Sequence, residues 1–105
     1  MFAAVRRYAG VDPALIEDLA ANAEAIGHVL TSAPGSADCE LIATREGLLV
    51  VSTGTDEATV AESGRRFAAW LDRHLPLLRQ SNPEVWAGRV LVRGVAGAPA
   101  EGGRS

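Results

Sequence analysis

Four short stretches of the chain have the pattern of β-strands. Residues 1–8, 39–44 and 85–95 place successive side chains on opposite sides with the two-residue period of a strand. Residues 48–53 predict another strand, whose first four residues are apolar on both sides. Because only residues 45–47 separate the second strand from the third, we expect these two strands to form a hairpin. In the last strand, Gly88 marks the position where we expect a bulge.

A first helix is predicted between the first two strands. Asp12 can accept hydrogen bonds from free backbone N–H groups, and Pro13 suits the first helical position. Residues 34–35, Pro-Gly, end the helix. Between this start and this end, apolar residues recur on one face with the helical period, which predicts a single continuous helix packed on the sheet. These residues are Leu15, Leu19, Ala23, Ile26 and Leu30.

A second helix is predicted after the hairpin. Asp56 is its expected cap, and Pro76 ends it. Its core-facing positions fall within a narrow arc of the helix, whereas Trp70 lies at the margin of that arc. The core-facing positions are Val60, Gly64, Phe67 and Leu71.

The element order strand, helix, strand, strand, helix, strand predicts an α+β protein with a ferredoxin-like βαββαβ fold. Right-handed crossovers place both helices on one face of an antiparallel sheet, so the other face has no cover within the chain. Residues 48–51 are nevertheless apolar on both sides. We therefore expect a symmetric homodimer that buries the uncovered face.

Length and composition indicate one domain, over residues 1–95, followed by a flexible tail of Gly, Ala and Pro over residues 96–105. The net charge of −3 favours neither a nucleic-acid nor a membrane partner. Cys39 is the single cysteine, so neither an intrachain disulfide nor a cysteine-based metal site is expected. The sequence has no signal-peptide pattern or membrane span, and we expect a cytoplasmic location. All ten basic residues are Arg, which suggests a GC-rich, bacterial coding bias.

Trp70 and His74 are the first candidates for a functional site. They lie one helical turn apart at the edge of the apolar face, where side chains can meet both the core and an opening. Imidazole can transfer a proton near neutral pH, so His74 is the candidate catalytic base, and Trp70 offers a flat surface to a planar ligand. The alternative is that Trp70 only packs and that His74 complements the helix dipole.

Further candidates for binding a substrate come from the strands. Arg6 and Tyr8 share one face of the first strand and could line the same cavity. Arg89 alternates with Leu91 and could bind an anionic ligand together with Arg93. The alternatives are packing for Tyr8 and surface ion pairs for the two arginines of the last strand.

Three segments of the chain resemble the dimeric α/β-barrel superfamily, which includes antibiotic-biosynthesis-monooxygenase-like proteins. They are the opening strand (2–8), the helix exit with Pro-Gly (30–35), and the segments 83–85 and 88–92 of the last strand. The resemblance implies a dimer with its sheets packed face to face and, in each subunit, a ligand pocket between sheet and helices. Some members are cofactor-free oxygenases and others degrade haem. Arg6 and Arg7 stand in the region where the haem-degrading type carries an Asn, so no cofactor is expected.

The sequence therefore predicts a protein that binds a small organic molecule, with a cofactor-free monooxygenase acting on a phenolic or quinone-like compound as the enzymatic hypothesis. The alternative is a non-enzymatic ligand-sensing or interaction domain similar to an ACT domain. An RNA-recognition domain is disfavoured because residues 47–51 contain no aromatic ring for base stacking. A heavy-metal carrier is disfavoured because no cysteine pair follows the first strand.

Overall fold

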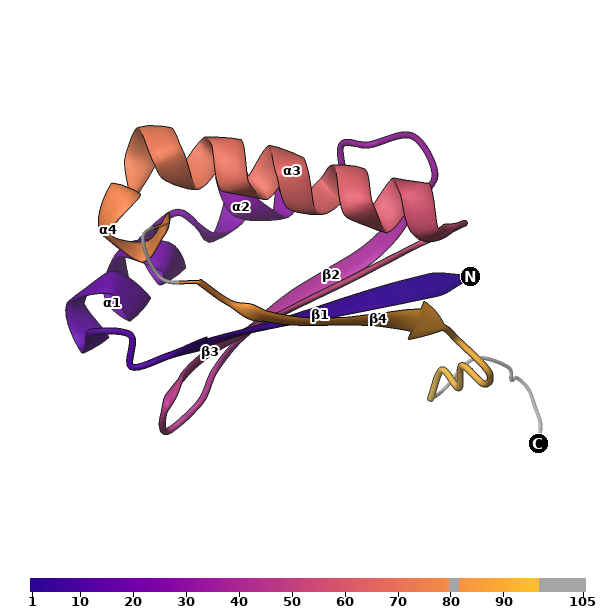
Figure 1. The fold of residues 1–105 in the computed structure, drawn as a ribbon, viewed down its shortest axis with the longest axis horizontal. Coiled ribbons are helices and arrows are strands. Elements are labelled where there is room, and N and C mark those ends of the chain that lie inside the picture. The colour runs from indigo at the N-terminus through magenta and orange to yellow at the C-terminus, as the bar shows by residue number, and fades with distance from the viewer. Residues whose placement is uncertain (80–81, 97–105) are drawn as a thin grey trace.

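The computed structural model describes residues 1–79 and 82–96 and has the predicted ferredoxin-like α+β architecture (Figure 1). Its four strands form one antiparallel sheet in the order β2-β3-β1-β4, and the helices lie together on one face of this sheet. The elements in chain order are β1 (Phe2–Ala9), α1 (Pro13–Ala21), α2 (Ala23–Leu30), β2 (Ser36–Ala43), β3 (Gly47–Gly54), α3 (Glu57–His74), α4 (Pro76–Arg79) and β4 (Glu84–Arg89).

The prediction of one continuous helix after β1 is wrong, because the chain breaks into α1 and α2 at Asn22. The helix starts as expected, with the Asp12 carboxylate accepting from the Ala14 N–H at 2.8 Å. At Asn22 the backbone leaves helical geometry, with φ −107° and ψ 19°. The Asn22 side chain donates to the Asp18 carbonyl at 2.8 Å. Asn side chains compete in this way for backbone groups, and the helix then restarts in a new direction.

Helix α3 begins at the predicted cap. The Asp56 carboxylate accepts from both the backbone N–H and the hydroxyl of Thr59, at 2.9 and 2.8 Å. Val60, Phe67 and Leu71 face the sheet and are fully buried, as their helical spacing predicted. Pro76 ends α3 at His74 and starts the single turn of α4, whose Leu78 is also buried.

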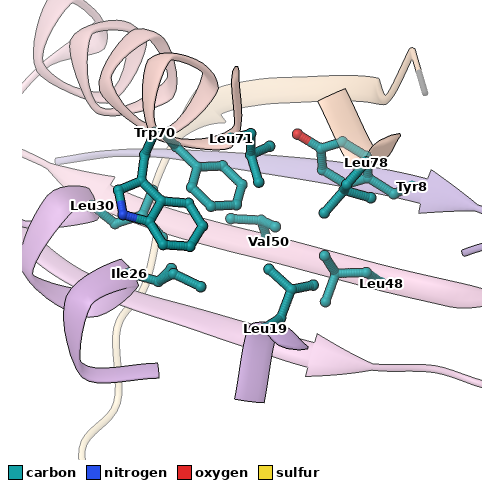
Figure 2. Packing of buried hydrophobic residues seen from close by; sticks show 10 residues of the cluster. Tyr8, Leu19, Ile26, Leu30, Leu48, Val50, Trp70, Leu71 and Leu78 are labelled. Atoms are coloured by element: carbon teal, nitrogen blue, oxygen red, sulfur yellow. The ribbon is translucent and has the colours of Figure 1, made fainter. Parts of the chain in front are cut away.

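The hydrophobic core lies between the helices and the sheet (Figure 2). Trp70, expected at the margin of the apolar face, is 6 % exposed and projects from α3 toward α2. The prediction for Trp70 was wrong because it considered one helix packed on a sheet alone, which leaves this flank of the helix open. In the structure α2 lies beside α3 and covers the flank. The cluster consists of Tyr8, Leu19, Ile26, Leu30, Leu48, Val50, Phe67, Trp70, Leu71 and Leu78.

The last strand is shorter than predicted, since β4 ends at Arg89 instead of residue 95. Arg89 pairs with Phe2, and the Val90 N–H donates to the Met1 carbonyl at 2.8 Å, so β1 offers no further partner beyond this point. Leu91 is accordingly 80 % exposed. The expected bulge at Gly88 is also absent from β4, whose pairing with β1 is regular. A register irregularity instead lies in β2, between Ser36 and Cys39.

The predicted tail over residues 96–105 cannot be compared with the structure, because residues 97–105 lie outside the described residues.

The face of the sheet opposite the helices, here called the open face, is mostly apolar. Strand register places on it alternate residues of all four strands. Ile42 is 41 % and Trp86 53 % exposed there. No helix of the described residues covers this face (Figure 1). Its apolar members are Ala3, Val5, Ile42, Leu49, Val51 and Trp86.

Candidate functional site

A cavity of about 410 Å³ lies between α1, α2 and the helix-facing side of β2 and β3. Most of its wall is aliphatic, and Cys39 contributes a polar side chain. Glu40 is also part of the lining, but it pairs with Val51, so its side chain points to the open face of the sheet. The complete lining is Ile16, Leu19, Ala20, Ala23, Ile26, Gly27, Cys39, Glu40, Leu41, Ala43 and Leu48.

Small residues on the facing walls create the space. Ala20 contributes from α1, Ala23 and Gly27 lie one turn apart on the same side of α2, and Ala43 contributes from β2. A Cβ atom added at Gly27 would meet no atom within 4 Å, so the cavity reaches the backbone of α2. Larger side chains at these positions would close the gap between helix and strand.

The polar chemistry of the cavity is modest. The Cys39 thiol donates to the Gly27 carbonyl across 3.9 Å. Burial, together with the neighbouring carboxylates of Asp38 and Glu40, raises the pKa of this thiol. A raised pKa keeps the sulfur protonated and weakly nucleophilic. The wall therefore suits contact with apolar groups better than covalent catalysis through Cys39.

Trp70 and His74 lie elsewhere. Their rings stack with centroids 4.6 Å apart and planes 30° apart, and His74 is exposed while Trp70 is part of the core. Neither residue lines the cavity. The proton-transfer role of His74 and the ligand-binding role of Trp70 remain predictions.

Arg6 and Tyr8 are brought together, as their shared strand face predicted. Burial lowers the pKa of the Arg6 guanidinium and raises the pKa of the Tyr8 phenol. Nη2 of Arg6 donates to the Val60 carbonyl of α3 at 3.4 Å. Neither side chain lines the cavity beside α2.

Arg89 does not lie near Tyr8 in the structure. It is exposed and pairs with Phe2, six residues from Tyr8 along β1, which corresponds to about 20 Å of strand. Its role in binding a substrate remains a prediction. Arg93 forms a surface ion pair with Asp38. Beside that pair, a second hollow of about 580 Å³ lies on the open face, between the edge of β2 and β3 and the residues after Arg93.

The aliphatic cavity was not identified from the sequence. The small residues that form it are each unremarkable in a helix or a strand, and the available signal is the spacing of Ala23 and Gly27, which lie on one side of α2. That spacing indicates a cavity only when the facing strand is known to carry small residues too.

Residues 1–79 and 82–96 contain no cluster of three or more His, Cys, Asp or Glu side chains that could hold a metal ion. Within the same residues, every helix is too short or too polar to cross a lipid bilayer.

Neither a family model nor a curated protein sequence matches the chain. Solved structures do match. A candidate antibiotic biosynthesis monooxygenase from Nitrosomonas europaea is 11% identical, with a TM-score of 0.68 over 88% of this chain and 100% of that one. A conserved protein from Methanosarcina mazei Go1 is 16% identical, with a TM-score of 0.61 over 85% and 92% of the two chains. A candidate monooxygenase from Shewanella loihica PV-4 is 14% identical, with a TM-score of 0.56 over 88% and 96%.

These matches extend over most of each chain, while the sequence identity is too low to transfer an activity. The shared architecture is the four-stranded antiparallel sheet with helices on one face. The chain therefore has the ferredoxin-like fold of the antibiotic-biosynthesis-monooxygenase-like proteins, as its sequence resemblance implied.

Proposed function

We propose that this protein binds a small, predominantly apolar organic molecule in the cavity between α1, α2 and β2. The observation that carries the proposal is the cavity itself: about 410 Å³, reaching the backbone at Gly27 and walled by aliphatic side chains. Ligand pockets in proteins typically measure about 300–1,000 Å³ and combine apolar walls with a few polar groups.

The wall also indicates which ligands fit. The ionisable side chain that the strand register directs into the cavity is the protonated Cys39 thiol, and the lining contains no Lys, Arg or His. An anionic ligand would be buried there without a compensating cation, which disfavours binding. A neutral and mostly apolar molecule, such as a small phenol, therefore matches the wall best.

A second candidate is oxidation of that ligand without a cofactor. It is supported by two structural neighbours described as candidate monooxygenases. In this hypothesis molecular oxygen is the oxidant, and the ligand supplies the electrons. Oxygen consumption that depends on the bound compound and on the protein would separate this activity from simple binding, which consumes none.

The protein is also proposed to act as a symmetric homodimer that pairs the open faces of two sheets. The support is the row of apolar side chains on that face, including the exposed Ile42 and Trp86. A twofold interface uses the same patch twice, so one apolar face suffices. The ion pairs of Arg7 with Glu46 and Glu84 place charged groups at the end of the same face, where a polar rim is expected.

The binding proposal is tested by mass spectrometry of the natively purified protein. We expect the unmodified chain and Ala25→Leu to carry the same small molecule, and Gly27→Leu to lose it because the new side chain fills the cavity. Ala25 is the matched control, since it is exposed on the same helix. A molecule retained by Gly27→Leu, or absent from the unmodified protein, would contradict the proposal.

A further inference from the structure

The strongest feature outside the cavity is the half-buried side chain of Arg6. It points from the middle of β1 toward the helices, between Val50 of β3 and Val85 of β4. Its Nη1 atom is buried and has no hydrogen-bond partner among the described residues. The 3.4 Å contact from Nη2 to the Val60 carbonyl is long for a hydrogen bond. The N–H donors on Nη1 are thus buried without a hydrogen-bond partner, and Nη2 has only this long contact.

No carboxylate of residues 1–79 and 82–96 forms an ion pair with Arg6. Five other arginines in the same residues do have acidic partners, namely Arg7, Arg65, Arg66, Arg79 and Arg93. Burying a charge without a counter-charge is strongly unfavourable. Water could accept a hydrogen bond from Nη1 but would not neutralise the charge, whereas an anion would do both.

Helix α3 leaves room for this guanidinium at Gly64, which has no side chain. A Cβ atom added at Gly64 would lie 2.0 Å from Nη2 and 2.7 Å from Cζ of Arg6. Glycine in a helix interior is unfavourable compared with alanine. The chain therefore has a helix-destabilising residue at the one turn of α3 where the guanidinium needs room, so the position of Arg6 is built into the fold.

A second donor lies beside it. The Tyr8 ring follows Arg6 on the same face of β1 and is buried, and Figure 2 shows its oxygen directed away from Leu48. Arg6 and Arg79 are close enough to the phenol to oppose the rise that burial causes in its pKa. That raised pKa keeps the hydroxyl protonated at neutral pH, so it can donate a hydrogen bond.

The site is reached from the side of β4. Val85 and Ala87 lie on the helix-facing side of this strand, paired with Arg6 and Ala4, yet both are exposed. The helices cover the same face over β1 and β3, where Ala4 and Val50 are buried. A ligand can therefore approach Arg6 along the uncovered side of β4.

We propose that the Arg6 guanidinium and the Tyr8 hydroxyl form a binding site for an oxyanion, the carboxylate or phosphate group of a small molecule, between α3 and the helix-facing side of β1 and β4. Guanidinium binds planar or tetrahedral oxyanions through paired N–H donors. This site is separate from the aliphatic cavity, whose lining includes neither residue, and does not depend on the function proposed for it.

The test is an NMR titration of the full chain with sodium benzoate and, separately, with sodium phosphate at constant ionic strength. We expect a saturable shift of the Arg6 Nε resonance with at least one anion. Benzoate alone would identify an organic carboxylate as the ligand group, phosphate alone would identify a phosphate group, and either result supports the site. Absence of a saturable shift with both anions would overturn the proposal without requiring any variant.

Variants then test which residues bind. Arg6→Met should weaken binding by about tenfold or more, because the charged hydrogen bonds are lost. Arg73→Met is the control: it removes one exposed charge from α3 and should change the affinity by less than about twofold. Equal weakening in both would indicate a general effect of net charge and would refute the site. If Arg6→Met does not fold, Arg6→Lys keeps the charge and should bind more weakly than the unmodified chain.

Gly64→Ala and Gly27→Leu complete the test. Gly64→Ala displaces the guanidinium without changing any charge and should also weaken anion binding. Gly27→Leu fills the aliphatic cavity and should leave the titration unchanged. The outcome for the oxyanion site is thus independent of the outcome for the cavity.

Discussion

Gly27→Ala should stabilise the protein, and the size of the gain can be worked out from the structure. Gly27 is the fifth of eight residues in α2, and its added Cβ would meet nothing within 4 Å. Replacing an interior helical glycine by alanine is worth about 1 kcal/mol when no clash opposes it. For a domain of this size, that gain raises the midpoint of thermal unfolding by about 4–8 °C.

Gly64→Ala is the matched comparison, since it makes the same change in the interior of α3. Here the new Cβ would lie 2.0 Å from Nη2 of Arg6, so the guanidinium must move and its contact with the Val60 carbonyl is lost. Displacing the half-buried guanidinium and losing this long contact costs on the order of 1 kcal/mol, which offsets the gain in helix propensity. We therefore expect a change in stability near zero.

Urea unfolding followed by circular dichroism, with a shared slope for all three proteins, measures both differences. A loss of stability in Gly27→Ala would show that atoms occupy the space beside α2, and would remove the basis of the proposed ligand cavity. Equal gains in the two variants would show that Arg6 does not lie against Gly64.

Three further predictions concern single residues. The Ser52 hydroxyl is buried with no partner among the described residues, so Ser52→Ala should leave the free energy of unfolding unchanged or raise it by about 1 kcal/mol; a clear loss would reveal a bound water. Hydrogen bonds from Thr59 lower the pKa of Asp56, so the cap stabilises the fold above the ordinary carboxyl pKa of about 3.9 and this contribution disappears as the pH falls through the lowered value. Stability curves of the unmodified chain and Asp56→Ala should accordingly differ at pH 7 and converge in acid. Val51→Asp places a charge in the open face and should convert the proposed dimer to a monomer in sedimentation; an unmodified chain that is already monomeric at micromolar concentration would contradict the proposed interface.

The sequence predicted the order and type of the main elements because each has a local cause. Alternation of side chains identified β1, the short turn at residues 45–47 identified the hairpin, and Asp12 and Asp56 marked the two helix starts. Helical periodicity did not reveal the break at Asn22, because the apolar spacing continues across it. The last strand was predicted to reach residue 95 because the alternation of its side chains continues to that point. The strand ends earlier because β1 provides no pairing partner beyond Arg89.

The candidate sites were less predictable, because they depend on distances between elements. The aliphatic cavity results from small residues on α1, α2 and β2 facing one another, and no single segment shows that. Arg6 was a candidate only through its position on β1. Its unsatisfied Nη1 and its fit against Gly64 depend on how closely α3 approaches the sheet.

The sheet order has a consequence for how the chain is made. β1 is the first strand in the sequence but lies inside the sheet, where Phe2 pairs with Gly54 on one side and Arg89 on the other. During synthesis the N-terminal residues emerge first, so β1 leaves the ribosome long before either neighbour exists. Until residues 47–54 arrive, both of its edges present unpaired N–H and C=O groups, and one edge stays open until residues 84–89 follow. Pairing of this central strand with another molecule therefore competes with folding until its own hairpin and last strand are available.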